Sequence, residues 1–322
     1  MFGMSVDGSY LKNTYRIEGK LGTGGNGEVY KVWHMRLRKF YVIKAHRAGA
    51  KGAVETLRNE AEALKNLKSL YVPQVFDFLA DEKTSYTIME YIEGESFDKL
   101  LRENEKYERS KVIKWYYQLA TALEEMHEKG VCHRDIKPSN IMLTDRGDIC
   151  LIDFDSAVVI GRSVGAINRS MGYASPEQEK FFDICKRAYT ERIRHAKGGG
   201  VALKVAESGS LYCNIDWKLS DIYSLGATMH HILFGKQPTE TENSADNFLQ
   251  KTECVTALEY IIERSLHSAP SERFPSARDI KSAINNNYYC TGSLSSSSLV
   301  FSSPSMRPSS TSAARRRWEP SD

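Results

Sequence analysis

The sequence predicts an α+β fold with two lobes: a small antiparallel sheet with one key helix, followed by a larger helical lobe. Between residues 15 and 91, short apolar runs alternate with turn residues, which is typical of strands. Beyond Glu93-Gly94, apolar residues recur at helical spacing, as in residues 110–128 and 221–234. The change of period at a glycine indicates two structural units that share a cleft.

The small lobe is expected to hold several strands and one helix. The helix is predicted over residues 54–68, because Ala61, Leu64 and Leu67 lie at helical spacing with charged residues on the other face. The strands are short and separated by turn residues. They are predicted at residues 15–17, 28–32, 40–43, 75–79 and 86–89.

The larger lobe is expected to be mainly helical. Residues 110–128 carry one apolar stripe, and Ser110 is the expected N-cap of that helix. Residues 221–234 repeat the helical pattern. Between these helices, residues 141–143 and 149–152 are apolar runs joined by a polar turn, which predicts a β-hairpin.

Composition narrows the class of protein. The chain has 322 residues, of which 41% are hydrophobic and 26% charged, and these values are ordinary for a globular protein. A net charge of +3 gives no reason to expect nucleic acid or an anionic membrane as the main partner. No membrane span and no secretory signal are expected. The six cysteines form no C-x-x-C pair, which favours reduced thiols and a cytoplasmic location.

The chain divides into four regions. An N-terminal extension is expected at 1–14, the small lobe at 15–91 and the large lobe at 92–289. Residues 290–322 are rich in Ser and Arg and poor in apolar anchors. We expect this tail to be disordered, because it cannot bury enough surface to offset its ordering entropy.

A glycine-rich segment lies between the first two predicted strands. Residues 22–29 fit G-x-G-x-x-G-x-V, and glycines let a backbone fold close over phosphates because no Cβ blocks the approach. An ordinary Gly-rich hairpin or a dinucleotide-binding loop would share this pattern. A dinucleotide-binding loop joins a strand to a helix, whereas strands are predicted here on both sides.

The most informative stretch lies between residues 133 and 155. It reads H-R-D-I-K-P-S-N over 133–140, and Asp153-Phe154-Asp155 follows. Phosphoryl transfer needs a group beside the attacking hydroxyl and ligands for the metal ions that neutralise phosphate charge. An Asp, a Lys, an Asn and a second Asp in this order meet both needs. Each carboxylate taken singly could belong to an acidic cluster on the surface. Such a cluster would not explain why an Asp, a Lys, an Asn and a second Asp follow one another in this order.

These motifs resemble those of the eukaryotic-like protein serine/threonine kinases. The sequence as a whole, including Gly172-Tyr173 and the Pro-Glu-Gln run, is similar to bacterial members of this class. The resemblance covers about residues 15–285 and implies ATP together with Mg²⁺ or Mn²⁺. It implies that Asp135 is the catalytic base or orients the substrate hydroxyl, and that Lys137 contacts the transferring phosphoryl group. It makes Asn140 and Asp153 metal ligands. The lysine in D-I-K-P-S-N favours serine/threonine over tyrosine specificity.

The resemblance also implies a nucleotide pocket. The family lysine, here Lys44, contacts the α- and β-phosphates and pairs with a helix glutamate. Glu60 is preferred for that pair over Glu62, which lies about 200° further round the helix. Ser96 or Glu95 is expected to reach the ribose. The residues implied to bind ATP are Leu21, Gly22, Gly24, Gly27, Val29, Lys44, Glu90, Ile92 and Ser96.

Two elements of the helical lobe extend the resemblance. Ser175-Pro176-Glu177 resembles the family's A-P-E, and Arg273 is the expected ion-pair partner of Glu177. Asp221, in D-I-Y-S-L-G, is expected to brace the catalytic loop. These elements disfavour a small-molecule kinase.

The chain departs from the family in two places. Asp155 replaces the glycine of D-F-G, which restricts the backbone, adds a carboxylate near the metals and puts conformational switching of this loop in doubt. An insertion at about 183–215 is either a partner-docking element or a solvated loop-plus-helix extension.

The predicted function is transfer of the ATP γ-phosphoryl group to Ser or Thr hydroxyls of protein substrates, with autophosphorylation. Arg134 is expected to meet phosphorylated Ser163, while Ser170 corresponds to the family's substrate-pocket threonine. The alternative is a nucleotide-binding pseudokinase that acts as a scaffold or regulator, which D-F-D and the insertion would both suit.

Overall fold

The computed structural model describes most of the two predicted lobes. The described residues are 11, 13–24, 27–47, 61, 64–65, 67–80, 84–103, 105–160, 169–196, 215–238 and 256–288. Several predictions therefore lie outside the described residues. These are the helix glutamate Glu60 with most of 54–68, the phosphorylation site Ser163, the second part of the insertion, the tail 290–322 and most of the extension 1–14.

The small lobe is built on a five-stranded antiparallel sheet. Its spatial order is β1-β2-β3-β5-β4. Tyr41 and Ile43 on β3 are buried and form an apolar core with Val32, Tyr86 and Ile88. All the predicted strands are present, each longer than predicted. Their bounds are Tyr15–Gly24 (β1), Gly27–His34 (β2), Lys39–Arg47 (β3), Val75–Ala80 (β4) and Thr84–Glu90 (β5).

The junction between the lobes is the predicted glycine. Gly94 has φ +147°, and a Cβ there would lie 2.1 Å from the carbonyl oxygen of Leu143. It begins the short strand β6 (Gly94–Ser96), which leads directly into α3 (Phe97–Arg102). Only glycine fits this backbone conformation and this close approach without strain.

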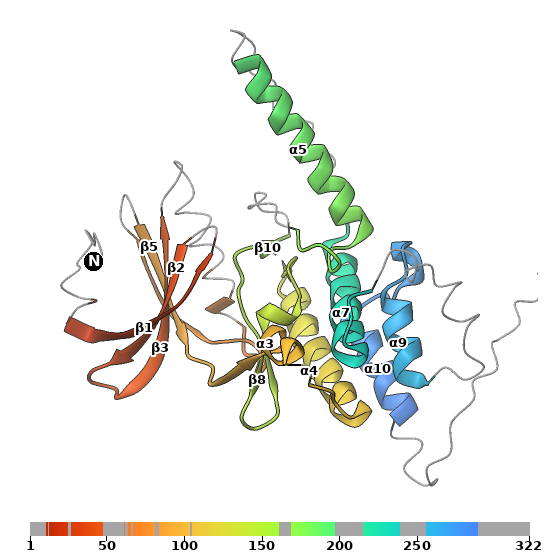
Figure 1. Cartoon of the computed structure of the whole chain (residues 1–322), viewed down its shortest axis with the longest axis horizontal. Helices are drawn as coiled ribbons and strands as arrows, with labels where there is room; N and C mark the ends of the chain where they lie inside the picture. Colours follow the sequence, from red (N-terminus) through yellow and green to blue (C-terminus); the bar gives the residue numbers. More distant parts are fainter. Residues whose placement is uncertain are drawn as a thin grey trace, which may run out of the picture.

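The large lobe is mainly helical (Figure 1). Its helices pack around a continuous apolar core. Both predicted helices are present, and α4 lies against both α7 and α10. The predicted N-cap of α4 is wrong: Glu108 stands at that position without a side-chain cap bond, and Ser110 lies inside the first turn. Helix bounds are Arg109–Glu128 (α4), Trp217–Phe234 (α7), Ala257–Ser265 (α9) and Ala277–Tyr288 (α10).

Short strands position the loops between the lobes. The predicted hairpin is present as β8 (Ile141–Thr144) and β9 (Ile149–Leu151), and β8 also pairs with β6. A second pair joins β7 (Val131–Cys132) to β10 (Val158–Val159). These two pairs hold the beginning and the end of the 133–155 stretch.

The insertion begins within a helix. Helix α5 (Pro176–Ala196) starts at the Ser175-Pro176-Glu177 element and extends away from the body of the molecule (Figure 1). Its first part is anchored, since Phe181 is buried against Trp217 and Cys132. The predicted insertion therefore begins as a continuation of α5 rather than as a separate loop.

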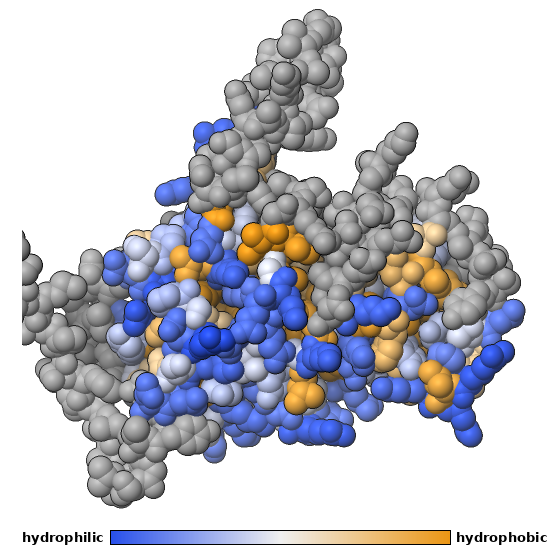
Figure 2. Space-filling model, turned by 180° about the vertical axis from the view of Figure 1, so that it is seen from behind, coloured by the Kyte–Doolittle hydropathy of each residue, from blue (hydrophilic) through white to orange (hydrophobic). Residues whose placement is uncertain are grey.

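The surface of the described part is mainly polar. Figure 2 shows a hydrophilic face interrupted by separate apolar groups. Leu37, Leu70 and Met171 are among the exposed large apolar side chains. Among the described helices, none combines the length and the apolar character that a membrane crossing requires.

Candidate active site

The hairpin β8–β9 brings two predicted metal ligands together. Ile141 pairs with Leu151, so the residues flanking this pair meet at one end of the hairpin. The backbone N–H of Ile152 donates to the carbonyl oxygen of Asn140 at 2.8 Å. Asp153 follows directly with φ +64°, a left-handed conformation that non-glycine residues seldom adopt. Asn140 and Asp153 thus lie at the same edge of the hairpin, as predicted.

Lys44 reaches this edge from the sheet lobe. It lies on β3 opposite Val29 of β2, and its Nζ contacts Asp153 Oδ1 at 2.6 Å. Burial alone would lower the pKa of Lys44, but the charges of Asp153 and Asp155 outweigh burial and raise it. Burial would likewise raise the pKa of Asp153, yet Lys44 holds it below its usual range. Both groups are therefore charged at neutral pH.

Asp135 is the centre of a polar cluster. Its Oδ1 accepts a hydrogen bond from Ser170 Oγ at 2.6 Å, and its Oδ2 accepts one from Lys137 Nζ at 2.8 Å. Lys137 also donates to Ser170 Oγ at 2.8 Å. The amide of Asn140 donates to the carbonyl oxygen of Asp135 at 2.8 Å and to Oδ2 at 3.1 Å. The predicted catalytic residues Asp135 and Lys137 are thus held together.

His133 supports this loop rather than acting within it. Its Nε2 lies 3.2 Å from the carbonyl oxygen of Ile152, which only accepts, so Nε2 carries the proton. Its Nδ1 then accepts from the Asp135 N–H at 3.3 Å. Burial lowers the pKa of His133, which keeps the ring neutral. The ring also lies edge-on to Phe154, 5.0 Å between centroids.

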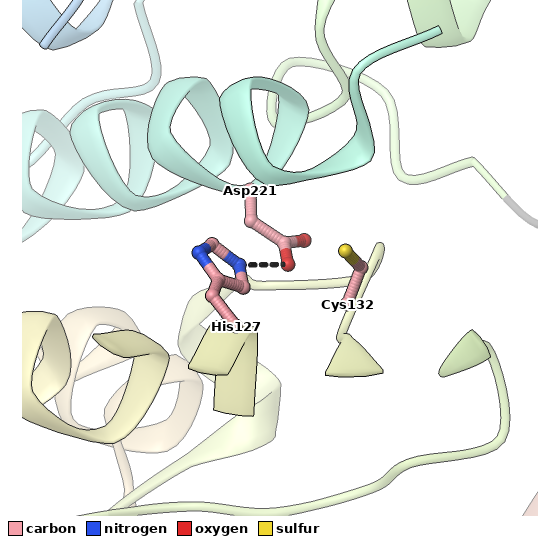
Figure 3. A group of neighbouring side chains, drawn as sticks. All are labelled: His127, Cys132 and Asp221. Carbon is pink, nitrogen blue, oxygen red and sulfur yellow. Dashed lines mark hydrogen bonds and ion pairs between the residues drawn. The ribbon is translucent and has the colours of Figure 1, made fainter. Parts of the chain in front are cut away.

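Asp221 braces the catalytic loop from α7, as predicted. Its Oδ2 accepts from the His133 N–H at 2.8 Å and lies 3.0 Å from His127 Nε2, while Oδ1 accepts from the Arg134 N–H at 2.7 Å. Arg134 has φ +63°, so the carboxylate holds an uncommon backbone conformation. Figure 3 shows His127, Cys132 and Asp221 pointing toward one another.

These last three side chains have the chemistry of metal ligands, with all ligand atoms within 4.8 Å of one another. The Asp221 oxygens already serve the three nitrogens described above. The Cys132 thiol stays protonated, because burial first and the Asp221 charge second raise its pKa. Asp221 therefore acts as a hydrogen-bonded brace of the loop rather than as a metal ligand.

The Ser175-Pro176-Glu177 element is fixed by a buried ion pair. Arg273 forms a two-pronged contact with Glu177, at 2.6 Å and 2.9 Å. Its guanidinium also donates to the carbonyl oxygens of Leu219, His267 and Ser268. The predicted pair is confirmed, and every nitrogen of the arginine has an acceptor.

The glycine-rich segment is a strand-to-strand connection, as predicted. Gly22 pairs with Val29, and Gly24 pairs with Gly27, while the two residues between them lie outside the described part. A Cβ on Gly27 would lie 1.9 Å from the carbonyl oxygen of Ala45 on β3, whereas Gly22 has open space. Leu21 is 52% exposed beside the segment. The glycines at positions 22 and 27 leave no Cβ on this segment, which suits a phosphate-binding role.

The connection between the lobes includes Glu90, Ile92 and Ser96, which the family resemblance implies to bind ATP. The Glu90 N–H donates to the carbonyl oxygen of Gln74, so this N–H is already paired within the protein. Tyr91 and Ile92 are half-buried. Ser96 caps α3, because its Oγ accepts from the Lys99 N–H at 3.4 Å. Glu95 pairs with Lys99. The predicted ribose contact would have to share Ser96 with this cap.

The donor set fits a magnesium nucleotide. Carboxylate and amide oxygens are ligands that Mg²⁺ prefers, and Asp153 and Asn140 supply them at one hairpin edge. The buried ammonium of Lys44 provides positive charge for phosphates. Lys137 provides a second one beside Asp135.

Asp155 and Gln178 make contacts that were not predicted from the sequence. Asp155 pairs with Lys44, with Asp155 Oδ1 2.5 Å from Lys44 Nζ. Gln178 donates through Nε2 to the carbonyl oxygen of Arg134 at 2.8 Å and accepts from Ser220 Oγ through Oε1. Asp155 stood out as a departure from the family pattern, but no local pattern distinguishes Gln178.

Comparison with known proteins identifies the family. The protein kinase domain model matches residues 15–181, a little over half of the 322 residues. The match ends within α5, where the insertion begins. The chain therefore belongs to the protein kinase domain family.

Three bacterial relatives carry the name serine/threonine-protein kinase or probable serine/threonine-protein kinase. A probable serine/threonine-protein kinase of Clostridium acetobutylicum is 28% identical over 303 residues, covering 87% of this chain and 41% of that protein. One of Clostridium perfringens is 33% identical over 180 residues, covering 54% and 26%. Serine/threonine-protein kinase PrkC of Bacillus subtilis is 24% identical over 296 residues, covering 86% and 41%. The chain spans less than half the length of these curated relatives.

Proposed function

We propose that this chain is a protein serine/threonine kinase that transfers the γ-phosphoryl group of ATP to Ser or Thr hydroxyls of protein substrates. The observation that supports this most strongly is the meeting of Lys44, from the sheet lobe, with Asp153, from the hairpin. The Asp135 cluster lies at the same edge of the hairpin, because Asn140, which donates to Asp135, is found there beside Asp153. An ammonium for phosphates, ligands for a metal and a carboxylate for a hydroxyl are therefore available to one substrate pair.

The proposed roles follow from the contacts. Asp135 orients the substrate hydroxyl and accepts its proton, in a position held by Asn140. Lys137 stabilises negative charge on the transferring group. Lys44 binds the α- and β-phosphates, and Glu60 is its proposed helix partner. Asn140 and Asp153 hold Mg²⁺ or Mn²⁺, which when bound neutralises phosphate charge.

The same proposal assigns the rest of the nucleotide pocket. Gly22, Gly24 and Gly27 lie in the segment that would cover the phosphates, with Leu21 and Val29 beside it. The backbones of Glu90 and Ile92 would meet the adenine edge, and Ser96 the ribose.

The proposal also includes a cytoplasmic location.

Autophosphorylation at Ser163 is a further part of the proposal. Arg134 is buried, and its Nε donates to the carbonyl oxygen of Ser156 at 2.6 Å. Its guanidinium also lies over Trp217, 5.1 Å from the ring centroid. A phosphate on Ser163 would have to compete with these contacts for the guanidinium. Mass spectrometry after incubation with ATP and Mg²⁺ should find phosphate on Ser163, and an unmodified Ser163 would count against autophosphorylation there.

Transfer of radiolabelled phosphate from ATP tests the proposal. The full chain with Mg²⁺ or Mn²⁺ should label a generic basic protein, and Asp135→Asn and Lys44→Met should each abolish labelling. Asp145→Asn, an exposed carboxylate in the β8–β9 turn, is the matched control and should label normally. No labelling by the wild type, with ATP binding retained, would support the pseudokinase alternative instead.

A further inference from the structure

Asp155 has a contact that the family's glycine cannot make. Lys44 Nζ lies between two carboxylates, 2.6 Å from Asp153 Oδ1 and 2.5 Å from Asp155 Oδ1. One ammonium thus faces two negative charges. Only one of these carboxylates, Asp153, has a proposed role with a metal ion.

The two carboxylates differ in exposure. The Asp155 side chain is 17% exposed and the Lys44 side chain 11%, whereas Asp153 is 39% exposed. The contact between Asp155 and Lys44 is therefore the more sheltered of the two. A sheltered ion pair is screened less by water and salt than an open one.

The backbone accommodates the aspartate without strain. Among the described residues, the non-glycine positions with positive φ are Arg38, Arg134 and Asp153, and Asp155 is not one of them. Its N–H points to Asp153 Oδ1 at 3.4 Å, and the Ala157 N–H donates to the Phe154 carbonyl oxygen at 3.0 Å. The turn is thus formed by residues on both sides, and the glycine that the family uses here is not needed for it.

We propose that Asp155 is a positioning residue: its carboxylate anchors the Lys44 ammonium when Asp153 binds a metal ion. This inference rests on the proposed function, because it concerns how Lys44 meets the nucleotide. Binding a metal at Asp153 would remove one of the two carboxylate anchors of Lys44 that the described part of the chain shows. The Asp155 carboxylate would then keep the Lys44 ammonium beside the phosphates. A side chain that is already held in place loses less conformational freedom when ATP binds.

Calorimetric titration of ATP with Mg²⁺ into the full chain tests this without needing turnover. Asp155→Asn keeps the shape of the side chain and removes its charge, while Asp155→Gly restores the family residue. Each should weaken ATP binding about tenfold, the size typical of coupling between close charged partners. Asp145→Asn is the matched control and should bind like the wild type. Thermal unfolding without nucleotide shows that each variant is folded.

The decisive comparison is made in a Lys44→Met background. If Asp155 acts through Lys44, adding Asp155→Asn to Lys44→Met produces no further weakening. Equal weakening in both backgrounds, or ATP binding by Asp155→Asn as tight as wild type, would overturn the proposal. In the transfer assay, both Asp155 variants should also lower kcat/KM. A higher kcat/KM with Asp155→Gly than with the wild type would overturn the proposal too.

The two proposals fail in different ways. A chain that binds ATP through the Lys44–Asp155 coupling but transfers no phosphate would refute the kinase function and leave the positioning role intact. Normal transfer without the coupling would refute only the role of Asp155. Absence of ATP binding by the wild type would refute both.

Discussion

The ion pair between Arg273 and Glu177 supports the sharpest stability prediction. Arg273 is 1% exposed, contacts Glu177 through two nitrogens and donates to three backbone carbonyls. Its guanidinium also lies 5.0 Å from the ring centroid of Tyr223. Arg273→Ala removes all of these contacts and leaves the Glu177 carboxylate without its partner.

The expected cost follows from that burial. Removing one member of a buried ion pair costs about 3–5 kcal/mol, because the other charge stays desolvated. At about 2–4 °C per kcal/mol for a large domain, the melting temperature should fall by roughly 6–20 °C. Arg273→Lys should cost less than Arg273→Ala, since it keeps the charge but loses the planar, two-pronged geometry.

Thermal and urea unfolding of the full chain measure this cost. Arg278 is the matched control, because it also contacts two carboxylates, Glu124 and Glu128, but its side chain is 68% exposed. Arg278→Ala should cost no more than about 1 kcal/mol. Equal losses for Arg273→Ala and Arg278→Ala would refute the argument from burial.

Three further predictions concern the Asp135 cluster, the glycine-rich segment and a buried carboxylate on α9. Ser170→Ala removes the hydroxyl that contacts both Asp135 and Lys137, so steady-state kinetics should show kcat falling about tenfold with the KM for ATP unchanged. A change in the KM for ATP without a change in kcat would contradict this prediction. Gly27→Ala puts a Cβ 1.9 Å from a β3 carbonyl oxygen and should lower the free energy of unfolding in urea by about 1–3 kcal/mol. Gly22→Ala meets open space and should lower it less. A larger loss for Gly22→Ala than for Gly27→Ala would contradict this prediction. Glu263 has no hydrogen-bond partner among the described residues, and burial raises its pKa to about 7. Its folded pKa exceeds the unfolded value, so its stabilising contribution is present below pH 4.5 and is lost as the pH rises toward 7. Glu263→Gln should therefore flatten the dependence of unfolding free energy on pH in this window, and an unchanged slope would count against it.

Much of the fold could be predicted because the decisive signals are local. Alternation of apolar residues predicted the strands of the small lobe, and helical spacing predicted α4 and α7. Prediction failed where structure depends on a distant partner: β6 and β10 are two or three residues long and exist through pairing with β8 and β7. Helix α9 was not predicted, although Thr256 and Glu259 form a capping box that marks its start.

The site shows the same division. The order of Asp135, Asn140 and Asp153 along the chain indicated their roles, because phosphoryl transfer needs these residue types and a hairpin brings them together. The contact of Asp155 with Lys44 joins residues far apart in the sequence, and its existence depends on how β3 lies against the hairpin. Sequence alone marked Asp155 as a substitution for glycine and predicted a restricted turn. The structure adds that Asp155 has no positive φ and that its carboxylate pairs with Lys44.

Phosphoamino-acid analysis of a labelled protein substrate tests the central claim most directly. The full chain is incubated with radiolabelled ATP and Mg²⁺ beside Asp135→Asn, and the product is hydrolysed to separate phosphoserine, phosphothreonine and phosphotyrosine. A serine/threonine kinase should yield phosphoserine or phosphothreonine that is absent with Asp135→Asn. Label on tyrosine, label that survives Asp135→Asn, or no label from the wild type would contradict the account.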